Sequence, residues 1–124
     1  MDLKRYFENT KGLGVISTAD TNGHVDAAVY ARPHIMEDGL LAFIMRDRTT
    51  HENIRANPRA VFLFKEEGPG YVGKRLYLTK VREEDNVEVI ESIRRRSYVS
   101  DRDSEEPMFL VYFKVDKERS LIGD

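Results

Sequence analysis

Residues Leu13–Arg32, LGVISTADTNGHVDAAVYAR, decide the class of fold. Leu13–Ala19 and His24–Arg32 each read as a β-strand of small and β-branched residues. The four residues between them, Asp20–Gly23, are typical of a hairpin turn because an Asn-Gly pair accepts positive φ. Pro33 ends the second strand, since proline cannot donate a hydrogen bond to a neighbouring strand. The stretch therefore predicts two antiparallel strands joined by a tight turn.

The rest of the chain continues this pattern on both sides of the hairpin. Apolar residues at spacings of three and four predict helices at Asp2–Asn9, Thr49–Ala56 and Asp85–Arg96. Further strands are expected at Leu40–Met45, Ala60–Phe64, Arg75–Val81 and Met108–Val115. The expected strand Ala60–Phe64, AVFLF, is apolar on both faces. Other parts of the chain are therefore expected to cover it on both sides. Six strands without a βαβ rhythm predict a mainly β fold, a small six-stranded antiparallel barrel with short helices.

Length and composition narrow the classes of function. The 124 residues are expected to form one domain, 1–124, with a net charge of -2 that weighs against a dedicated nucleic-acid binder. The absence of cysteine excludes disulfides, thiolate catalysis and iron–sulfur clusters. No apolar run reaches membrane-spanning length and Met1–Lys4 does not begin a signal peptide, so a cytoplasmic location is expected.

The main candidate site is Phe43–Pro58, FIMRDRTTHENIRANP, where a strand pattern passes into a helix pattern. Thr49 and Glu52 have the spacing of a capping box, which would make this an ordinary helix start. A capping box leaves Arg46 and Arg48 unexplained, because cations near a helix N-terminus are unfavourable unless an anion lies between them. The residues alone are compatible with an ordinary helix start and with an anion site, and the second interpretation predicts that a phosphate binds here.

Two other sequence patterns, a glycine-rich segment and the three histidines, do not predict a site. Gly68–Arg75 nearly matches a P-loop, but Arg75 replaces the hydroxyl that binds magnesium, and a strand follows where a helix is required. The three histidines, His24, His34 and His51, lack the spacing of metal ligands, so no metal site is predicted.

The order of these motifs resembles that of the pyridoxamine 5′-phosphate oxidase-like family of FMN-binding split barrels. The resemblance rests on GxxSTAD with its Asn-Gly turn, on the strand that ends in basic and hydroxyl residues, and on N-I-x-x-N-P, and covers about Gly12 to Val81. It implies an FMN-binding split barrel, a homodimer with flavin at the interface, and redox chemistry carried out by the flavin.

The resemblance also implies which residues surround the flavin. Ala28, Val29, Tyr30 and Ala31 would border the ring, with Ile44, Met45 and Arg46 beside the ring and ribityl chain. The phosphate would meet Arg48, Thr49, Thr50 and His51, with Asn53 in the helix start. Lys74 and Arg75 would approach from the partner subunit.

This chain departs from the family where a lysine is often found close to Thr50, because His51 follows Thr50 here. Arg32, Arg46 or Arg48 could supply the missing charge. The resulting hypothesis is that the chain is an FMN-binding redox protein. It would be either a flavin-dependent oxidoreductase of unknown substrate or an electron carrier. The alternatives are a non-redox barrel for a phosphorylated or planar ligand (a sensor, a store or a haem-handling relative) and a single-strand nucleic-acid module using Tyr30, Tyr71 and Tyr77.

Overall fold

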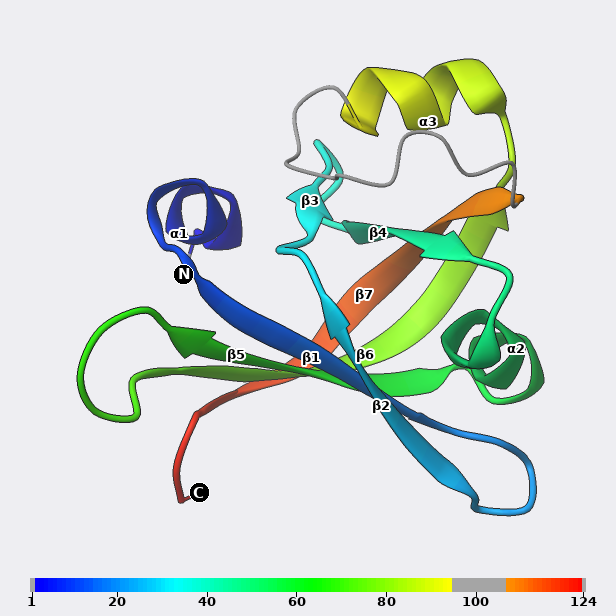
Figure 1. The fold of residues 1–124 in the computed structure, drawn as a ribbon. Helices are drawn as coiled ribbons and strands as arrows, with labels where there is room; N and C mark the ends of the chain where they lie inside the picture. The colour runs from blue at the N-terminus through cyan, green and yellow to red at the C-terminus, as the bar shows by residue number, and fades with distance from the viewer. Residues whose placement is uncertain (1, 95–106, 124) are drawn as a thin grey trace.

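The computed structural model of the protein describes residues 2–94 and 107–123. Within them, seven antiparallel strands form one curved sheet that closes most of a barrel (Figure 1). The strands are β1 (Gly12–Ala19), β2 (Val25–Tyr30), β3 (His34–Ile35), β4 (Leu41–Arg46), β5 (Arg59–Glu66), β6 (Gly73–Glu84) and β7 (Met108–Ser120). The helices are α1 (Leu3–Asn9), α2 (Thr49–Ala56) and α3 (Val87–Arg94). No helix of the described part is long and apolar enough to cross a membrane.

The sheet has the strand order β2-β1-β5-β6-β7-β4-β3, so β2 and β3 are its two edges. The predicted hairpin pairs β1 with β2 from Gly14↔Tyr30 to Ala19↔Val25. Gly23 has a φ of 83°, the positive value that the Asn-Gly turn requires. At the other edge, β3 pairs with β4 only through Leu41 and Ala42, so the rest of β4 has a free edge. The barrel is therefore split between β2 and β4.

The interior of the barrel is rich in aromatic rings. Phe62, Phe64 and Phe113 are fully buried, and Phe43 packs with its ring centroid 5.1 Å from that of Phe62. Phe7 of α1 covers one end of this core, 5.2 Å from Phe64. The inward rows of β1, β5, β6 and β7 interlock here, so the closed side of the barrel supplies most of the buried apolar surface.

A second, smaller core lies outside the barrel under α3. Ile90 and Ile93 of α3 pack on Ala42 of β4 and on Leu110 and Tyr112 of β7. Both faces are therefore covered in β4 and in the first half of β7, and the expectation for Ala60–Phe64 is wrong. No helix within residues 2–94 and 107–123 covers the outer face of β5, and Leu63 remains 37% exposed.

The structure agrees with the predicted order of elements and corrects the strand count. The mainly β split barrel has seven strands within the described residues, because the two-residue β3 lies between Pro33 and the turn at Gly39. A strand of two residues is too short to show an alternating pattern. The strands β5, β6 and β7 also extend beyond the predicted limits. Of the predicted helix Asp85–Arg96, Arg95 and Arg96 lie outside the described residues.

Candidate functional site

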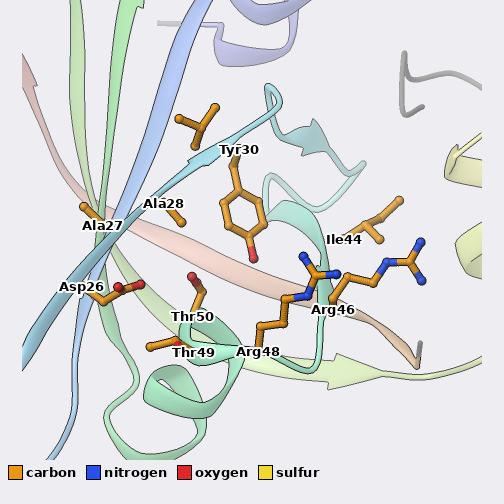
Figure 2. Close-up of a pocket in the computed structure, with 10 residues that line it drawn as sticks. Asp26, Ala27, Ala28, Tyr30, Ile44, Arg46, Arg48, Thr49 and Thr50 are labelled. Carbon is orange, nitrogen blue, oxygen red and sulfur yellow. The ribbon is translucent and has the colours of Figure 1, made fainter. Parts of the chain in front are cut away.

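A pocket of about 350 Å³ lies at the split of the barrel (Figure 2). It is lined by β2, by the end of β4 and by the first residues of α2. Because β2 pairs only with β1, alternate residues of β2 direct backbone N–H and C=O groups away from the sheet at this edge. The volume is within the range of small-molecule and cofactor sites, and the edge offers a ligand backbone hydrogen bonds.

The N-terminus of α2 forms one end of the pocket. Arg48 is the N-cap residue and makes no side-chain capping hydrogen bond, so the predicted capping box of Thr49 and Glu52 is wrong. The unpaired N–H groups of the first turn carry partial positive charge and are suited to an anion. Arg48, Thr49 and Thr50 all line the pocket at this point.

Polar side chains converge beside this helix end. Figure 2 shows the hydroxyl of Tyr30 pointing between Thr50 and the guanidinium of Arg48, while Arg46 extends away from them. Burial raises the pKa of Tyr30, and a hydrogen bond with Thr50 and the charge of Arg48 oppose part of that rise. The phenol therefore stays protonated at neutral pH and can donate a hydrogen bond.

The pocket is electrostatically mixed but positive on balance. Its charged lining residues are Asp26 on β2, Arg46 on β4 and Arg48 at the start of α2, two cations against one carboxylate. Asp26 stands on the strand opposite α2, with its carboxylate directed toward the Thr49–Thr50 end of the pocket (Figure 2). That carboxylate opposes an anion, whereas the hydroxyls, the N–H groups and the arginine at the start of α2 favour one.

Eight of the sequence-predicted residues line the pocket together. They are Ala28, Val29, Tyr30, Ile44, Arg46, Arg48, Thr49 and Thr50. Asp26 and Ala27 line it too, although the prediction left them out. The strand that contains them was recognised, and its two-residue periodicity placed beside the helix start would have pointed to Asp26.

Three predicted residues of the strands lie away from the pocket. Met45 is fully buried in the barrel core. Ala31 and Arg32 line a separate hollow of about 850 Å³ between α1 and the β3 region. Arg32 donates hydrogen bonds to the carbonyl oxygens of Phe7 (2.7 Å) and Thr10 (2.8 Å), which ties α1 to the end of β2.

Two predicted residues of α2 face inward. Nδ2 of Asn53 donates to Oγ1 of Thr18 at 3.0 Å, which joins α2 to β1. His51 is fully buried between two carboxylates and does not line the pocket. The helix thus turns Thr49 and Thr50 toward the pocket, while His51 and Asn53 attach it to the barrel.

Lys74 and Arg75 of β6 lie away from the pocket of their own chain. The ammonium of Lys74 is 2.6 Å from a carboxylate oxygen of Glu118 and lies over the ring of Tyr6. Arg75 donates hydrogen bonds to the carbonyl oxygens of Ser120 and Gly123. These contacts hold both cations at the beginning of β6.

No family model and no curated protein matches this chain. Solved structures do match its fold. An FMN-binding protein from Syntrophomonas wolfei subsp. wolfei superposes with a TM-score of 0.78 at 19% identity, over 98% of this chain and 84% of that one. A protein from Lactobacillus delbrueckii, provisionally named a pyridoxamine 5′-phosphate oxidase, gives 0.69 at 12% identity over 96% and 92%.

A third similar structure is a haem-binding protein from Mycobacterium smegmatis, with a TM-score of 0.61 at 17% identity. The match covers 94% of this chain but 51% of that protein. The three likenesses show that the chain has the split-barrel fold of pyridoxamine 5′-phosphate oxidase-like proteins, as its sequence motifs predicted.

Proposed function

We propose that the protein binds FMN in the pocket at the barrel split and serves as a flavin-dependent redox protein. The observation that carries the proposal is the meeting of the α2 N-terminus, Thr49, Thr50 and Arg48 in one pocket beside a free strand edge. The donor set is that of a phosphate site, and the adjoining strand edge suits the polar rim of a flat ring.

Each part of the pocket has a separate role in this proposal. Thr49, Thr50 and the N–H groups of the first turn bind the phosphate, and Arg48 balances its charge. Tyr30 donates from its neutral phenol, and Ile44 supplies apolar surface beside the ring. The flavin supplies the electron or hydride chemistry when bound, and the protein supplies binding, orientation and electrostatics.

The proposal includes a homodimer, with the outer face of the sheet as its interface. Val29 and Val25 of β2 are 70% and 83% exposed, and Leu13 and Leu63 add apolar surface on the neighbouring strands β1 and β5. Val15 pairs with both Val29 and Leu63, so these side chains share one face of the sheet. Val29 also lines the pocket. Arg75 pairs with Leu63 and so shares the outer face, and a second copy seated there would complete the ring slot with its Arg75. Lys74, the other residue predicted to reach across, is buried on the opposite face of β6 and is left out of the proposal.

Haem binding without redox turnover is the second candidate. Its support is the likeness to the haem-binding protein from Mycobacterium smegmatis. The described residues that line the pocket offer Tyr30 as an axial ligand but no histidine, cysteine or methionine. The donor set therefore favours a flavin phosphate over haem iron.

Cofactor titrations test the proposal directly. The wild-type protein is expected to bind FMN at least about tenfold more tightly than riboflavin, which lacks the phosphate. Arg48→Gln and Thr50→Val should each remove most of that preference and leave riboflavin affinity within about twofold. The matched control is Arg55→Gln, an exposed arginine in the last turn of the same helix. A wild-type protein that binds haem but neither flavin would reject the proposal in favour of the second candidate.

A further inference from the structure

His51 belongs to the first turn of α2, the turn proposed to bind the phosphate, but it is 0% exposed. Its Nδ1 is 3.0 Å from Oδ1 of Asp47, and its Nε2 is 3.0 Å from Oε2 of Glu83 on β6. The ring stacks on Phe109 of β7 with centroids 4.1 Å apart and planes 13° apart. The ring is therefore held on both edges and on one face.

Both nitrogens of the ring face carboxylate oxygens. A carboxylate only accepts hydrogen bonds, and an imidazole nitrogen donates only when it carries a proton. Glu83 is also paired with Lys80, 2.6 Å away, and Phe109 brings no charge from β7. Asp47, His51, Glu83 and Lys80 therefore form one connected polar cluster that joins the start of α2 to β6.

This cluster fixes the turn that carries the anion-binding groups. Arg46, Arg48, Thr49 and Thr50 line the pocket. His51 instead turns inward, and the half-exposed carboxylate of Asp47 contacts its ring from one turn earlier. Glu83 then ties that turn to β6 in the closed wall of the barrel. A loss of the tie would free the backbone of Arg48 and the N–H groups of the first turn.

We infer that His51 is a positioning residue, which clamps the start of α2 between Asp47 and Glu83 and so holds Arg48, Thr49 and Thr50 in the geometry that binds the phosphate. The inference deepens the proposed function and rests on it. It replaces the sequence-based interpretation that His51 meets the phosphate itself. Pre-organised donors bind more tightly because less ordering remains to be done on binding.

Two variants separate positioning from simple electrostatics. Glu83→Gln cuts the anchor to β6 but removes a negative charge, which alone would favour an anion. Glu52→Gln removes the same charge from an exposed position in the same turn of α2 and is the matched control. If His51 positions the turn, Glu83→Gln weakens FMN about threefold to tenfold, leaves riboflavin within about twofold, and Glu52→Gln weakens neither.

His51→Gln is expected to weaken FMN binding more than Glu83→Gln does, again with little effect on riboflavin. If His51→Gln does not fold, Glu83→Gln still tests the inference. Tightening of FMN by equal factors in Glu83→Gln and Glu52→Gln would overturn the inference in favour of charge alone. One readout needs no flavin. Amide exchange at position 52, whose N–H donates to the carbonyl oxygen of Arg48 at 3.0 Å, should be faster in Glu83→Gln than in Glu52→Gln.

Unchanged exchange at position 52 in Glu83→Gln would contradict the clamp even if FMN binds. A wild-type protein that binds no FMN, but whose Glu83→Gln variant shows the faster exchange, would reject the proposed function and leave the clamp intact.

Discussion

The closed wall of the barrel and its split are built from strands of the same sheet, yet they are stabilised differently. In the wall, β1, β5, β6 and β7 are paired on both sides and bury Phe62, Phe64 and Phe113 completely. At the split, β2 and the end of β4 each have a free edge, and the pocket lining mixes small apolar residues with hydroxyls and charged side chains. The comparison indicates that stability resides in the wall, whereas binding uses the edges that the wall leaves unpaired.

The largest expected effect breaks the wall. Phe62→Ala removes a fully buried ring that packs against Phe43 and Phe7, and should cost about 3–5 kcal/mol of unfolding free energy. Leu63→Ala, at the next residue on the outer face, should cost less than about 1.5 kcal/mol because its side chain is already partly exposed. Urea unfolding of both variants measures the difference. Equal losses would contradict the assignment of the inner and outer faces of β5.

A second change tests whether the wall and the split are mechanically connected. A Cβ atom at Gly14 would lie 2.5 Å from Cζ of Phe62 and 2.8 Å from the carbonyl oxygen of Tyr30. Gly14→Ala should therefore destabilise the protein by about 1–3 kcal/mol and displace β2 at the pocket. Urea unfolding and FMN titration should both change. A variant with wild-type stability would show that the contact between Gly14 and Phe62 is looser than described.

The third prediction concerns the tie between the two regions through Glu83. Burial acts to raise its pKa, but hydrogen bonds from Lys80 and His51 prevail and hold the pKa below the ordinary value of 4.5. A carboxylate with a lowered pKa in the folded state stabilises the fold above about pH 4.5, and this stabilisation is lost as the pH falls through the folded pKa.

Glu83→Gln should accordingly cost about 1–3 kcal/mol at pH 7. It should also lose less stability than the wild-type protein when the pH is lowered from 6 to 3. Urea midpoints across this range check both expectations, with Glu52→Gln as the exposed comparison. Parallel pH curves for the wild-type protein and Glu83→Gln would show that Glu83 carries no such linkage.

Leu63→Glu is expected to have the smallest effect on the stability of the single chain. It tests whether the outer face of the sheet is a dimer interface. If the outer face joins two copies, this charge should convert the dimer to a monomer in sedimentation and reduce FMN affinity about tenfold, because the partner no longer completes the slot. Val87→Glu is the control, since Val87 is 70% exposed on α3, away from that face. A Leu63→Glu variant that remains dimeric would require another interface.

The difference between wall and split also explains what the sequence could predict. The hairpin at Asp20–Gly23 and the helix Thr49–Ala56 are encoded by local chemistry, and both were placed correctly. The short β3 was missed because two residues carry no periodicity, and the double coverage of β4 depends on where α3 folds back. Such coverage is a tertiary property, since an apolar run alone does not reveal which neighbour will cover it.

The sequence predicted the pocket, like the fold, only in part. Eight of its lining residues were identified from β2, β4 and the start of α2, because these segments carry recognisable motifs. The inward rotation of His51 was not predictable, since its partner Glu83 lies 32 residues away in sequence. A basic or polar residue next to Thr50 could equally face a phosphate or a buried carboxylate until the register of β6 is known.

A crystal structure of the protein saturated with FMN would show whether the split holds a flavin phosphate at the start of α2. The phosphorus atom is expected at the N-terminus of α2, with phosphate oxygens within hydrogen-bonding distance of Thr49, Thr50 and Arg48, and with the ring against β2. FMN bound instead in the hollow beside Arg32 and His34, or no FMN bound at saturating concentration, would show that the split is not the flavin site.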